Sequence, residues 1–400
     1  MALCLIIDDD SPIQPPSSYK EAVKQDKGWM IAVQNELDAL GRNHTWELVP
    51  EPPEATVIDS RWVFTRKEVD GSTVLKARLV ARGFQLPTMD DEVVYSPVAR
   101  MMTLRMLLAL AVEKNYEISQ LDVKSAFLSS RLSEPVFMRP PDGLDNVPPG
   151  HVCKLLKSLY GLRQSPKCFN DYVSAKLSSL GFRRSQIDPC LYFNTSIMIL
   201  IWVDDFLLFS ESVDEINKIK VKLKSFFELK DFQSQSKLVF LGLEIEICKG
   251  RITLSQKALV DKIVKFFQMS DCKLQNVPVQ PNLNLPKVDG CDERFPYREL
   301  VGSLMYIMLG TRPDLCFAIS FFGRFQSGWS EIHWNALRNV VRYLKGTRDM
   351  GITYYNSGNP SELVVSAYVD SDFASDAIDR KSISGFLIKL NRNVIYWSSK

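Results

Sequence analysis

Three aspartates in two short apolar segments are the residues best suited to chemistry in this sequence. Asp204 and Asp205 interrupt the apolar run 197–209, and Asp122 directly follows the shorter segment 116–121. Short apolar runs are typical of buried strands. We therefore predict a strand, a tight turn carrying the acidic pair, and a return strand. The acidic pair also has a simpler explanation, because Asp is a common turn residue.

The three carboxylates would converge at one end of a sheet if these two segments form adjacent strands. Like charges held close together resist ionisation unless cations neutralise them. Oxygen ligands without His or Cys favour Mg²⁺, which is typically bound by one or two carboxylates together with substrate phosphates. Two such ions can clamp the attacking and leaving oxygens of a phosphoryl displacement. The residues therefore predict metal-dependent phosphoryl transfer at Asp122, Asp204 and Asp205.

Motifs along nearly the whole chain resemble the reverse transcriptase region of a copia-type LTR retrotransposon Pol polyprotein, with the start of its ribonuclease H domain. Residues 121–128 (LDVKSAFL) and 203–209 (VDDFLLF) are similar to the first and third motifs of the polymerase palm. The other motifs follow in the family's order: WELV at 46–49, RWVF at 61–64, KARLVARGF at 76–84, YSPV at 95–98, KLLKSLYGLRQSP at 154–166, FLGLEI at 240–245, LSQ at 254–256, GSLMY at 302–306, TRPD at 311–314 and RYLKGT at 342–347.

The resemblance implies an α+β fold with the fingers, palm and thumb of a right-hand polymerase, followed by a truncated ribonuclease H-like sheet. The implied activity is RNA-directed DNA polymerisation, a nucleotidyl transfer in which Asp122, Asp204 and Asp205 hold two Mg²⁺ ions, with Mn²⁺ as an alternative. The implied partners are an RNA or DNA template with its primer and deoxynucleoside triphosphates. The implied location is intracellular, in the cytoplasm or in virus-like particles. The sequence indicates no oligomeric state.

The resemblance also implies six residues that bind the substrate. They are Lys67 and Arg78 for the triphosphate, Phe127 under the sugar, and Tyr160, Gly161 and Arg163 near the nucleotide and the templating base. A bulky ring under the sugar is a sufficient filter, because the 2′-hydroxyl is the group that distinguishes ribose from deoxyribose. Simpler explanations stay open: a solvated sheet face for the basic residues, core packing for Phe127 and an ordinary turn for Gly161.

The length of 400 residues exceeds the size at which a single core usually stops growing, so several parts are expected. We expect a flexible lead-in (1–18), fingers and palm (19–276), a helical thumb and connection region (277–356) and a truncated ribonuclease H-like domain (357–400). Apolar stripes predict helices over about 28–40, 102–113, 167–180 and 214–227, and residues 57–83 are predicted to form strands.

The composition excludes several classes of protein. The eight cysteines include no CxxC pair and there are three histidines, which argues against a zinc site and for reduced thiols inside a cell. No apolar run reaches the roughly 18 residues that a membrane span requires, so no membrane partner is expected. The net charge of +2 would not by itself indicate a nucleic-acid partner.

The segment 357–400 is expected to be an incomplete ribonuclease H domain. Asp370 matches the first metal-binding carboxylate of such a domain, but the acidic residues that complete the site do not follow before Lys400. No ribonuclease H activity is therefore expected. Strands over 363–369, 385–390 and 394–398 would present an uncovered apolar face. We predict that this segment is poorly ordered or self-associates, and that removing it improves solubility.

Two other functions remain open at the level of the sequence. One is a catalytically inactive, nucleic-acid-binding remnant of a transposon, and the other is a host-recruited regulatory protein. Departures from the family pattern are Trp202, where Tyr is usual before the acidic pair, and a shortened loop at 86–92. The intact set of Asp122, Asp204 and Asp205 favours the enzyme.

Overall fold

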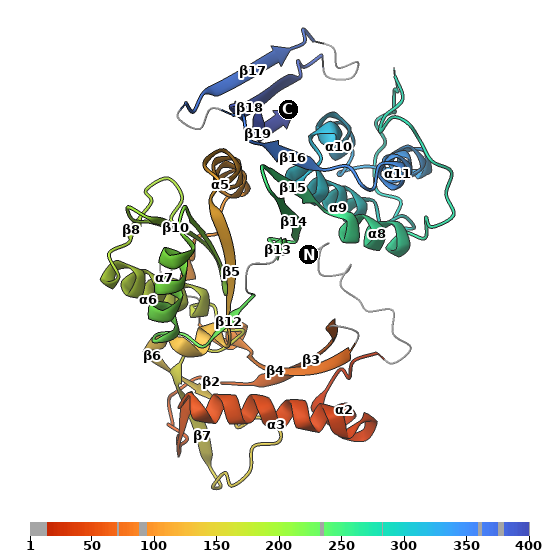
Figure 1. Ribbon diagram of the computed structural model, residues 1–400. Helices are drawn as coiled ribbons and strands as arrows, with labels where there is room; N and C mark the ends of the chain where they lie inside the picture. The colour runs from red at the N-terminus through yellow and green to blue at the C-terminus, as the bar shows by residue number, and fades with distance from the viewer. Residues whose placement is uncertain are drawn as a thin grey trace.

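The computed structural model describes residues 14–69, 72–87, 94–232, 236–281, 283–358, 362–374 and 380–399. Most of the predicted lead-in and most of the loop at 86–92 lie outside these residues. No helix within these ranges combines the length and the apolar character needed to cross a membrane. Figure 1 shows the hairpin of β3 and β4 (residues 60–81) below and the helices α8 (Lys257–Phe266), α9 (Tyr297–Gly310) and α11 (Glu331–Gly346) above, both to the right of β5 (Glu117–Val123).

The N-terminal part packs a hairpin and a small sheet against a long helix. Its elements are α2 (Tyr19–Gln25), α3 (Lys27–Arg42), β1 (Trp46–Pro50), β2 (Val57–Ile58), β3 (Ser60–Val69), β4 (Ser72–Ala81), η1 (Gly83–Gln85), β6 (Arg131–Met138) and β7 (His151–Lys157). The sheet has the order β1-β7-β6-β2, and β3 pairs only with β4 among the named strands. The helix α3 begins where the Asp26 side chain accepts a hydrogen bond from Gly28 N–H. Its stripe of Trp29, Val33 and Leu37 is buried, as predicted.

The central six-stranded sheet has the order β12-β5-β11-β10-β9-β8. Its elements and the helices on it are α5 (Met101–Lys114), β5 (Glu117–Val123), η2 (Ala126–Ser129), α6 (Ser165–Ser179), β8 (Arg183–Arg184), β9 (Leu191–Phe193), β10 (Ile197–Trp202), β11 (Asp205–Ser210), α7 (Val213–Lys224) and β12 (Leu229–Asp231). Along β11, Phe206 and Leu208 join the core under α6 and α7, whereas Leu207 and Phe209 join the core under α5. Both faces are covered, which explains why this strand is continuously apolar.

A third sheet and a group of helices follow. The sheet is β13 (Lys237–Phe240), β14 (Leu243–Cys248), β15 (Arg251–Ser255) and β16 (Ile352–Tyr355) in that order, and the helices are α8 (Lys257–Phe266), α9 (Tyr297–Gly310), η3 (Pro313–Leu315), α10 (Cys316–Gly323) and α11 (Glu331–Gly346). One buried core joins Val260 and Ile263 of α8 to Leu300 of α9 and Leu337 of α11. The helices therefore form a unit of their own.

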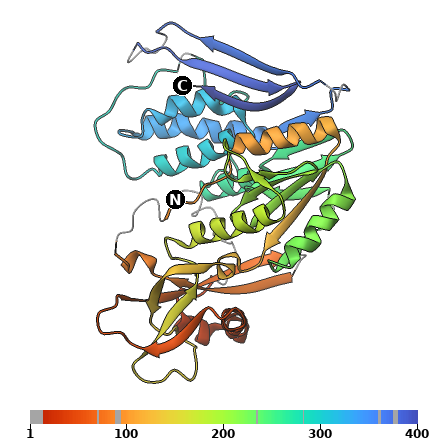
Figure 2. The same ribbon diagram turned by 90° about the vertical axis from the view of Figure 1, so that its left-hand side faces the viewer.

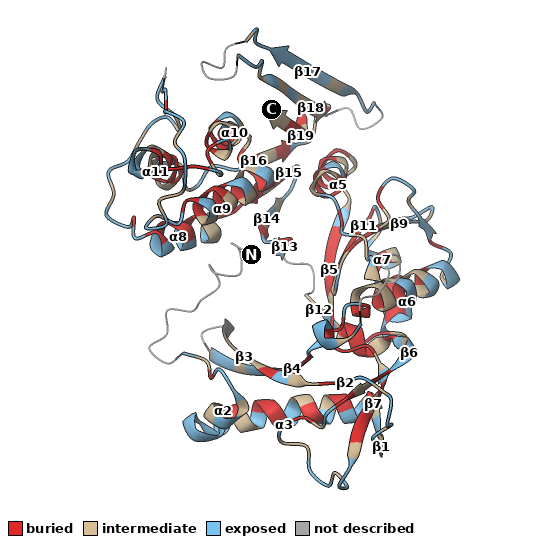
Figure 3. Cartoon of the chain, turned by 180° about the vertical axis from the view of Figure 1, so that it is seen from behind, coloured by how far each residue is buried: buried red, intermediate tan, exposed pale blue. Residues whose placement is uncertain are grey.

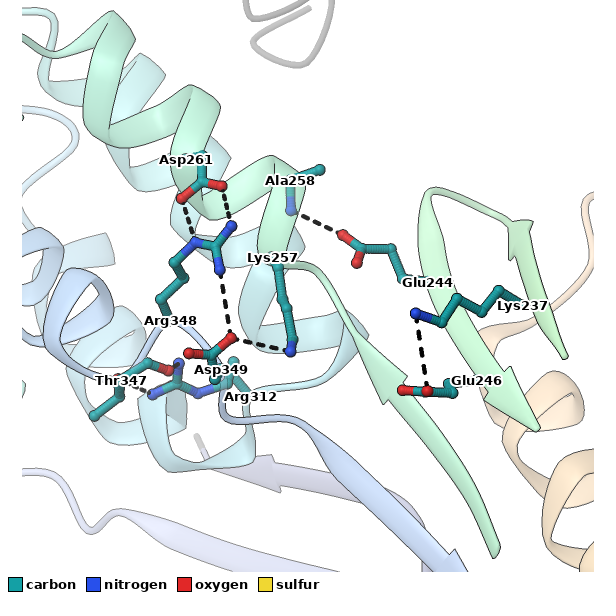
Figure 4. A network of polar contacts seen from close by, with 10 residues as sticks. All are labelled: Lys237, Glu244, Glu246, Lys257, Ala258, Asp261, Arg312, Thr347, Arg348 and Asp349. Carbon is teal, nitrogen blue, oxygen red and sulfur yellow. Dashed lines mark hydrogen bonds and ion pairs between the residues drawn. The ribbon is translucent and has the colours of Figure 1, made fainter. Parts of the chain in front are cut away.

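A polar network attaches these helices to β14 (Figure 4). Glu244 of β14 accepts a hydrogen bond from Ala258 N–H at 2.8 Å, so its carboxylate caps the first turn of α8. Arg348, just after α11, pairs with Asp261 of α8, and the neighbouring Asp349 pairs with Lys257 at 3.0 Å. These groups are largely exposed, so the network orients the helices more than it stabilises them.

The C-terminal sheet consists of β17 (Val365–Ser371), β18 (Ser384–Leu390) and β19 (Asn393–Ser399) in that order. The prediction of an uncovered apolar face is wrong for β19, because Ile395 and Trp397 are buried in the same core as Leu104 and Leu108 of α5. The same prediction is correct for β17, which is exposed along most of its length (Figure 3). Figures 1 and 2 show α5 lying between the central sheet and this C-terminal sheet.

Two buried charged residues of α5 fasten the C-terminal sheet. Arg105 is 3% exposed, donates to the carbonyls of Leu309 and Gly310 at the end of α9, and lies 3.7 Å from the centroid of the Trp397 ring. These carbonyls have no partner within their own helix. Burial lowers the pKa of Arg105 to about 10, so it stays charged at pH 7.

Glu113, which is fully buried, lies two turns further along α5. Its carboxylate accepts hydrogen bonds from the Ser357 hydroxyl at 2.7 Å and from the Asn393 amide at 3.3 Å. A buried carboxylate is tolerated only when donors of this kind replace water. Both ends of α5 therefore depend on residues far downstream in the sequence.

Candidate active site

Three aspartates lie at one end of the central sheet. Asp122 on β5 is the direct cross-strand partner of Asp205 on β11, and directly paired residues project from the same face of a sheet. Trp202 pairs with Asp205, so Val203 and Asp204 form a two-residue turn between β10 and β11. This hairpin and its pairing with β5 are the arrangement that the sequence predicts.

The turn that carries Asp204 is held in an unfavourable conformation. Val203 has φ 53°, a left-handed value that costs a β-branched residue about 1–3 kcal/mol. Val123 N–H donates to the Asp204 carbonyl at 2.8 Å, which fixes the turn against β5 one residue after Asp122. The backbone therefore sets the position of Asp204 relative to Asp122 before any ligand binds.

Asp122 has a second charged neighbour, which the sequence analysis missed. On the side away from Asp205, the cross-strand partner of Asp122 is Lys230 of β12. Lys230 is exposed, and its Nζ lies 4.6 Å from the centroid of the Phe232 ring. No sequence signal could have found it, because the pairing of a three-residue strand with β5 is set by tertiary packing.

The carboxylates do not form a complete metal site by themselves. Among the described residues, no group of three or more His, Cys, Asp or Glu side chains is placed to hold an ion. Asp122, Asp204 and Asp205 nonetheless supply only hard oxygen donors. This fits an ion such as Mg²⁺, which takes one or two carboxylates and completes its shell with water and substrate phosphates.

Tyr160 joins the aspartates to the N-terminal hairpin. Its ring meets the Phe127 ring edge-on at 4.8 Å, and the Arg78 guanidinium lies 5.0 Å from its centroid. Burial raises the pKa of Tyr160; Arg78 opposes this shift, while the charges of Asp204 and Asp122 add to it. Three of the predicted substrate-binding residues thus lie together beside the aspartates.

Phe127 and Arg163 occupy different environments. Phe127 is 8% exposed and also contacts the Phe169 ring at 6.1 Å, so core packing accounts for part of its role. Arg163 is exposed. The neighbouring Gln164, which the sequence analysis did not single out, is buried, and its Oε1 has no hydrogen-bond partner among the described residues.

Two further predicted residues lie apart from this group. Lys67 is in β3, where its backbone pairs with Val74, but its side chain falls outside the described part of the structure. Asp370 is exposed on β17, in the C-terminal sheet, where it accepts a hydrogen bond from Ser371 N–H at 3.0 Å. A cavity of about 410 Å³ lined by Tyr116, Ser210 and Glu211 lies at the opposite end of the central sheet from the aspartates.

Gly161 lets β4 approach the Tyr160 segment closely. Ala81 N–H donates to the Tyr160 carbonyl at 2.8 Å, and Gly161 has φ +91°. A Cβ atom at Gly161 would lie 2.1 Å from the Ala81 carbonyl oxygen. This position therefore requires glycine for its backbone conformation and also for the contact.

We expect Gly161→Ala to destabilise the chain by about 1–3 kcal/mol more than Gly181→Ala, because only the former drives a Cβ atom into backbone. Gly181 is a matched control, since it has φ +84° and a Cβ atom added there would have no neighbouring atom within 4 Å. Urea denaturation of both variants measures the difference. Equal losses of stability would show that conformational strain alone explains the need for glycine.

Comparisons with known proteins show which family the chain is similar to. Residues 43–281 match the family model described as "Reverse transcriptase (RNA-dependent DNA polymerase)". The chain is 33% identical over 416 residues to the retrovirus-related Pol polyprotein from transposon TNT 1-94 of Nicotiana tabacum, covering 99% of this chain and 31% of that polyprotein. It is 35% identical over 396 residues to the Pol polyprotein from transposon RE1 of Arabidopsis thaliana, covering 96% and 26%.

A shorter relative is matched along most of its own length. The putative transposon Ty5-1 protein of Saccharomyces cerevisiae is 31% identical over 288 residues, which are 70% of this chain and 92% of that protein. Among solved structures, a foamy viral protease-reverse transcriptase in complex with double-stranded DNA aligns with 94% of this chain and 56% of its own, at 15% identity and a TM-score of 0.47. The chain spans about a third or less of the plant polyproteins that it matches.

Proposed function

Because this chain belongs to the reverse transcriptase family found in the Pol polyproteins of copia-type retrotransposons, we propose that it is an RNA-directed DNA polymerase. The reaction joins a deoxynucleotide to a primer: the 3′-hydroxyl oxygen attacks the α-phosphate, the hydroxyl proton is lost and pyrophosphate leaves. The substrates on this proposal are a template with its primer and deoxynucleoside triphosphates, used inside the cell.

The observation that carries the proposal is the pairing of Asp122 with Asp205 beside the turn that holds Asp204. Two strands distant in sequence bring these carboxylates to one end of the sheet, with Lys230 on the other flank of Asp122. A purely structural role would not require acidic side chains as direct cross-strand partners, since like charges in that position are destabilising.

Asp122, Asp204 and Asp205 would hold two Mg²⁺ ions. When bound, such ions act as Lewis acids and lower the pKa of the attacking hydroxyl. The backbone of the β10–β11 turn orients Asp204, and the β5–β11 pairing orients Asp122 and Asp205. Lys230 flanks Asp122 on the β12 side, where it is the direct cross-strand partner.

The residues around Tyr160 are suited to the nucleotide. Arg78 lies against the Tyr160 ring and can donate to a triphosphate, a group for which the guanidinium fork is well matched. Phe127 packs against the same ring and would limit the space beside the sugar. Gly161 allows a close backbone approach, while Lys67 and the exposed Arg163 remain proposed contacts by position in sequence.

Primer extension by the purified chain on poly(rA)/oligo(dT) with Mg²⁺ tests this function. The expected result is template-dependent incorporation of dTTP that stops when the ion is chelated. Incorporation that does not depend on the template would contradict the proposal. Tight template–primer binding without extension would instead identify a nucleic-acid-binding protein that has lost its activity.

We expect Phe127→Ala to lower the preference for dNTP over rNTP by about 10–200-fold, since a pocket that loses part of its wall discriminates poorly by size. The ratio of kcat/KM for dTTP and UTP measures the effect. Phe169→Ala is the control, because Phe169 packs against Phe127 in the same core and removing it costs similar stability. An unchanged ratio in Phe127→Ala, or an equal change in both variants, would reassign Phe127 to the core alone.

A further inference from the structure

Gln120 connects the aspartate cluster to a hairpin more than one hundred residues downstream. It lies on β5 two residues before Asp122, on the same face of the strand, and is 7% exposed. Its Nε2 donates to Asp205 Oδ1 at 3.0 Å and to the Val239 carbonyl at 3.0 Å. An amide nitrogen has two hydrogens, so both donors of Gln120 are used.

The hydrogen bond to Asp205 constrains a proposed metal ligand. A bond to an ionised carboxylate is stronger than one between neutral groups. It occupies one oxygen of Asp205 and fixes the plane of the carboxylate. The orientation of the other oxygen then depends on where Gln120 lies.

The hairpin formed by β13 and β14 is held at two points. Gln120 holds Val239 on β13, and the Tyr306 hydroxyl of α9 donates to the Leu241 carbonyl in the turn at 2.6 Å. The turn residues Leu241 and Gly242 both have positive φ, 54° and 66°, as a type I′ turn requires. A Cβ atom at Gly242 would lie 2.7 Å from the Tyr306 hydroxyl oxygen, so glycine leaves room for this contact.

Packing does not lock Gln120 on every side. A cavity of about 610 Å³ opens between the central sheet and the β13–β15 sheet, and Gln120, Phe232, Leu238, Val239 and Ile245 line it. Although Gln120 is only 7% exposed, part of its side chain therefore forms a cavity wall. Its two hydrogen bonds fix the direction of the amide within this wall.

We propose that Gln120 is a positioning residue that orients Asp205 for a divalent cation and couples this orientation to the β13–β14 hairpin. The inference rests on the proposed function of the aspartates as metal ligands. Because one amide group bonds both acceptors, a displacement of Val239 alters the bond to Asp205. Linkage then requires the reverse effect, in which cation binding tightens the hairpin.

The test is Mn²⁺ binding to the full chain, followed by electron paramagnetic resonance of the free ion, together with amide hydrogen exchange of residues 237–243. Gln120→Met keeps the length of the side chain and removes both donors. We expect its Mn²⁺ affinity to fall about tenfold, as is typical when a partner that orients a metal ligand is lost. Exchange in the hairpin is expected to accelerate.

Ser119→Ala is the matched control. Ser119 is the preceding residue of β5, is 4% exposed, and its hydroxyl has no hydrogen-bond partner among the described residues. Its replacement should change neither readout. Tyr306→Phe supplies a second test that leaves the β5 residues intact: it should accelerate exchange in the hairpin and weaken Mn²⁺ binding by a smaller factor than Gln120→Met.

The outcomes separate this inference from the proposed function. Mn²⁺ affinity in folded Gln120→Met equal to that of the parent would overturn the inference even if the parent extends primers. Unchanged Mn²⁺ affinity in Tyr306→Phe despite faster exchange in the hairpin would overturn the coupling. If the unsubstituted protein bound Mn²⁺ but extended no primer, the proposed polymerase function would be contradicted. A tenfold weaker Mn²⁺ affinity in Gln120→Met would in that case still support the positioning role of Gln120.

Discussion

Asp204→Asn is expected to reduce primer extension by about 10²–10³-fold, because removing one electrostatic stabiliser from an active site typically costs that much in rate. The substitution keeps the size of the side chain and removes the negative charge. The turn should be retained, since Val123 bonds the Asp204 backbone and not its side chain. Single-nucleotide incorporation under saturating dTTP measures the effect.

Template–primer affinity should change by no more than a few-fold in the same variant, because phosphate contacts by basic residues dominate such binding. Asp214→Asn provides the control: Asp214 is an exposed carboxylate in the first turn of α7, and its replacement should leave extension unchanged. If Asp204→Asn lost binding in proportion to activity, Asp204 would have a structural role instead.

Trp397→Ala is expected to lower the free energy of unfolding by about 3–5 kcal/mol, the usual cost of truncating a buried aromatic residue to alanine. The indole is 6% exposed, lies against the Arg105 guanidinium and donates to the Met308 carbonyl at 3.2 Å. Its loss would leave Arg105 in a cavity. Urea denaturation followed by tryptophan fluorescence and far-UV circular dichroism measures the change.

Phe373→Ala is the corresponding control in the same C-terminal segment. Phe373 is 95% exposed, so its replacement should shift stability by less than about 0.5 kcal/mol. Removing residues 357–400 altogether should be more damaging than Trp397→Ala, because Glu113 would also lose the donors Ser357 and Asn393. A shortened chain that is more soluble and fully active would restore the view of this segment as dispensable.

The local elements of the fold follow from the sequence because short-range patterns specify them. The acidic turn lies between two apolar runs, and the stripe of α3 ends with Leu40, so the β10–β11 hairpin and the helix are both predicted within a few residues. The gathering of Asp122 with Asp205 is also predicted, once the two apolar segments are assumed to be neighbouring strands.

The features that the sequence did not predict correctly are contacts between segments that are distant in the chain. The cover on β19 comes from α5, and the second neighbour of Asp122 comes from a three-residue strand. In the sequence alone, Gln120 is an ordinary polar residue of a predicted strand. Only the structure shows that Val239 lies beside it. Such contacts depend on how whole elements pack, and no periodicity within either segment encodes them.

The partners of α5 set an order of events during synthesis on the ribosome. Arg105 bonds the carbonyl of Ile395, 290 residues later in the chain, and Glu113 bonds Asn393, 280 residues later. At a synthesis rate of roughly 5–20 residues per second, about 15–60 s pass between the synthesis of α5 and the synthesis of these groups. During that interval a helix with an apolar surface and two charges destined for burial lacks its final cover. The packing of α5 on the C-terminal side is therefore completed only after β19 has been synthesised.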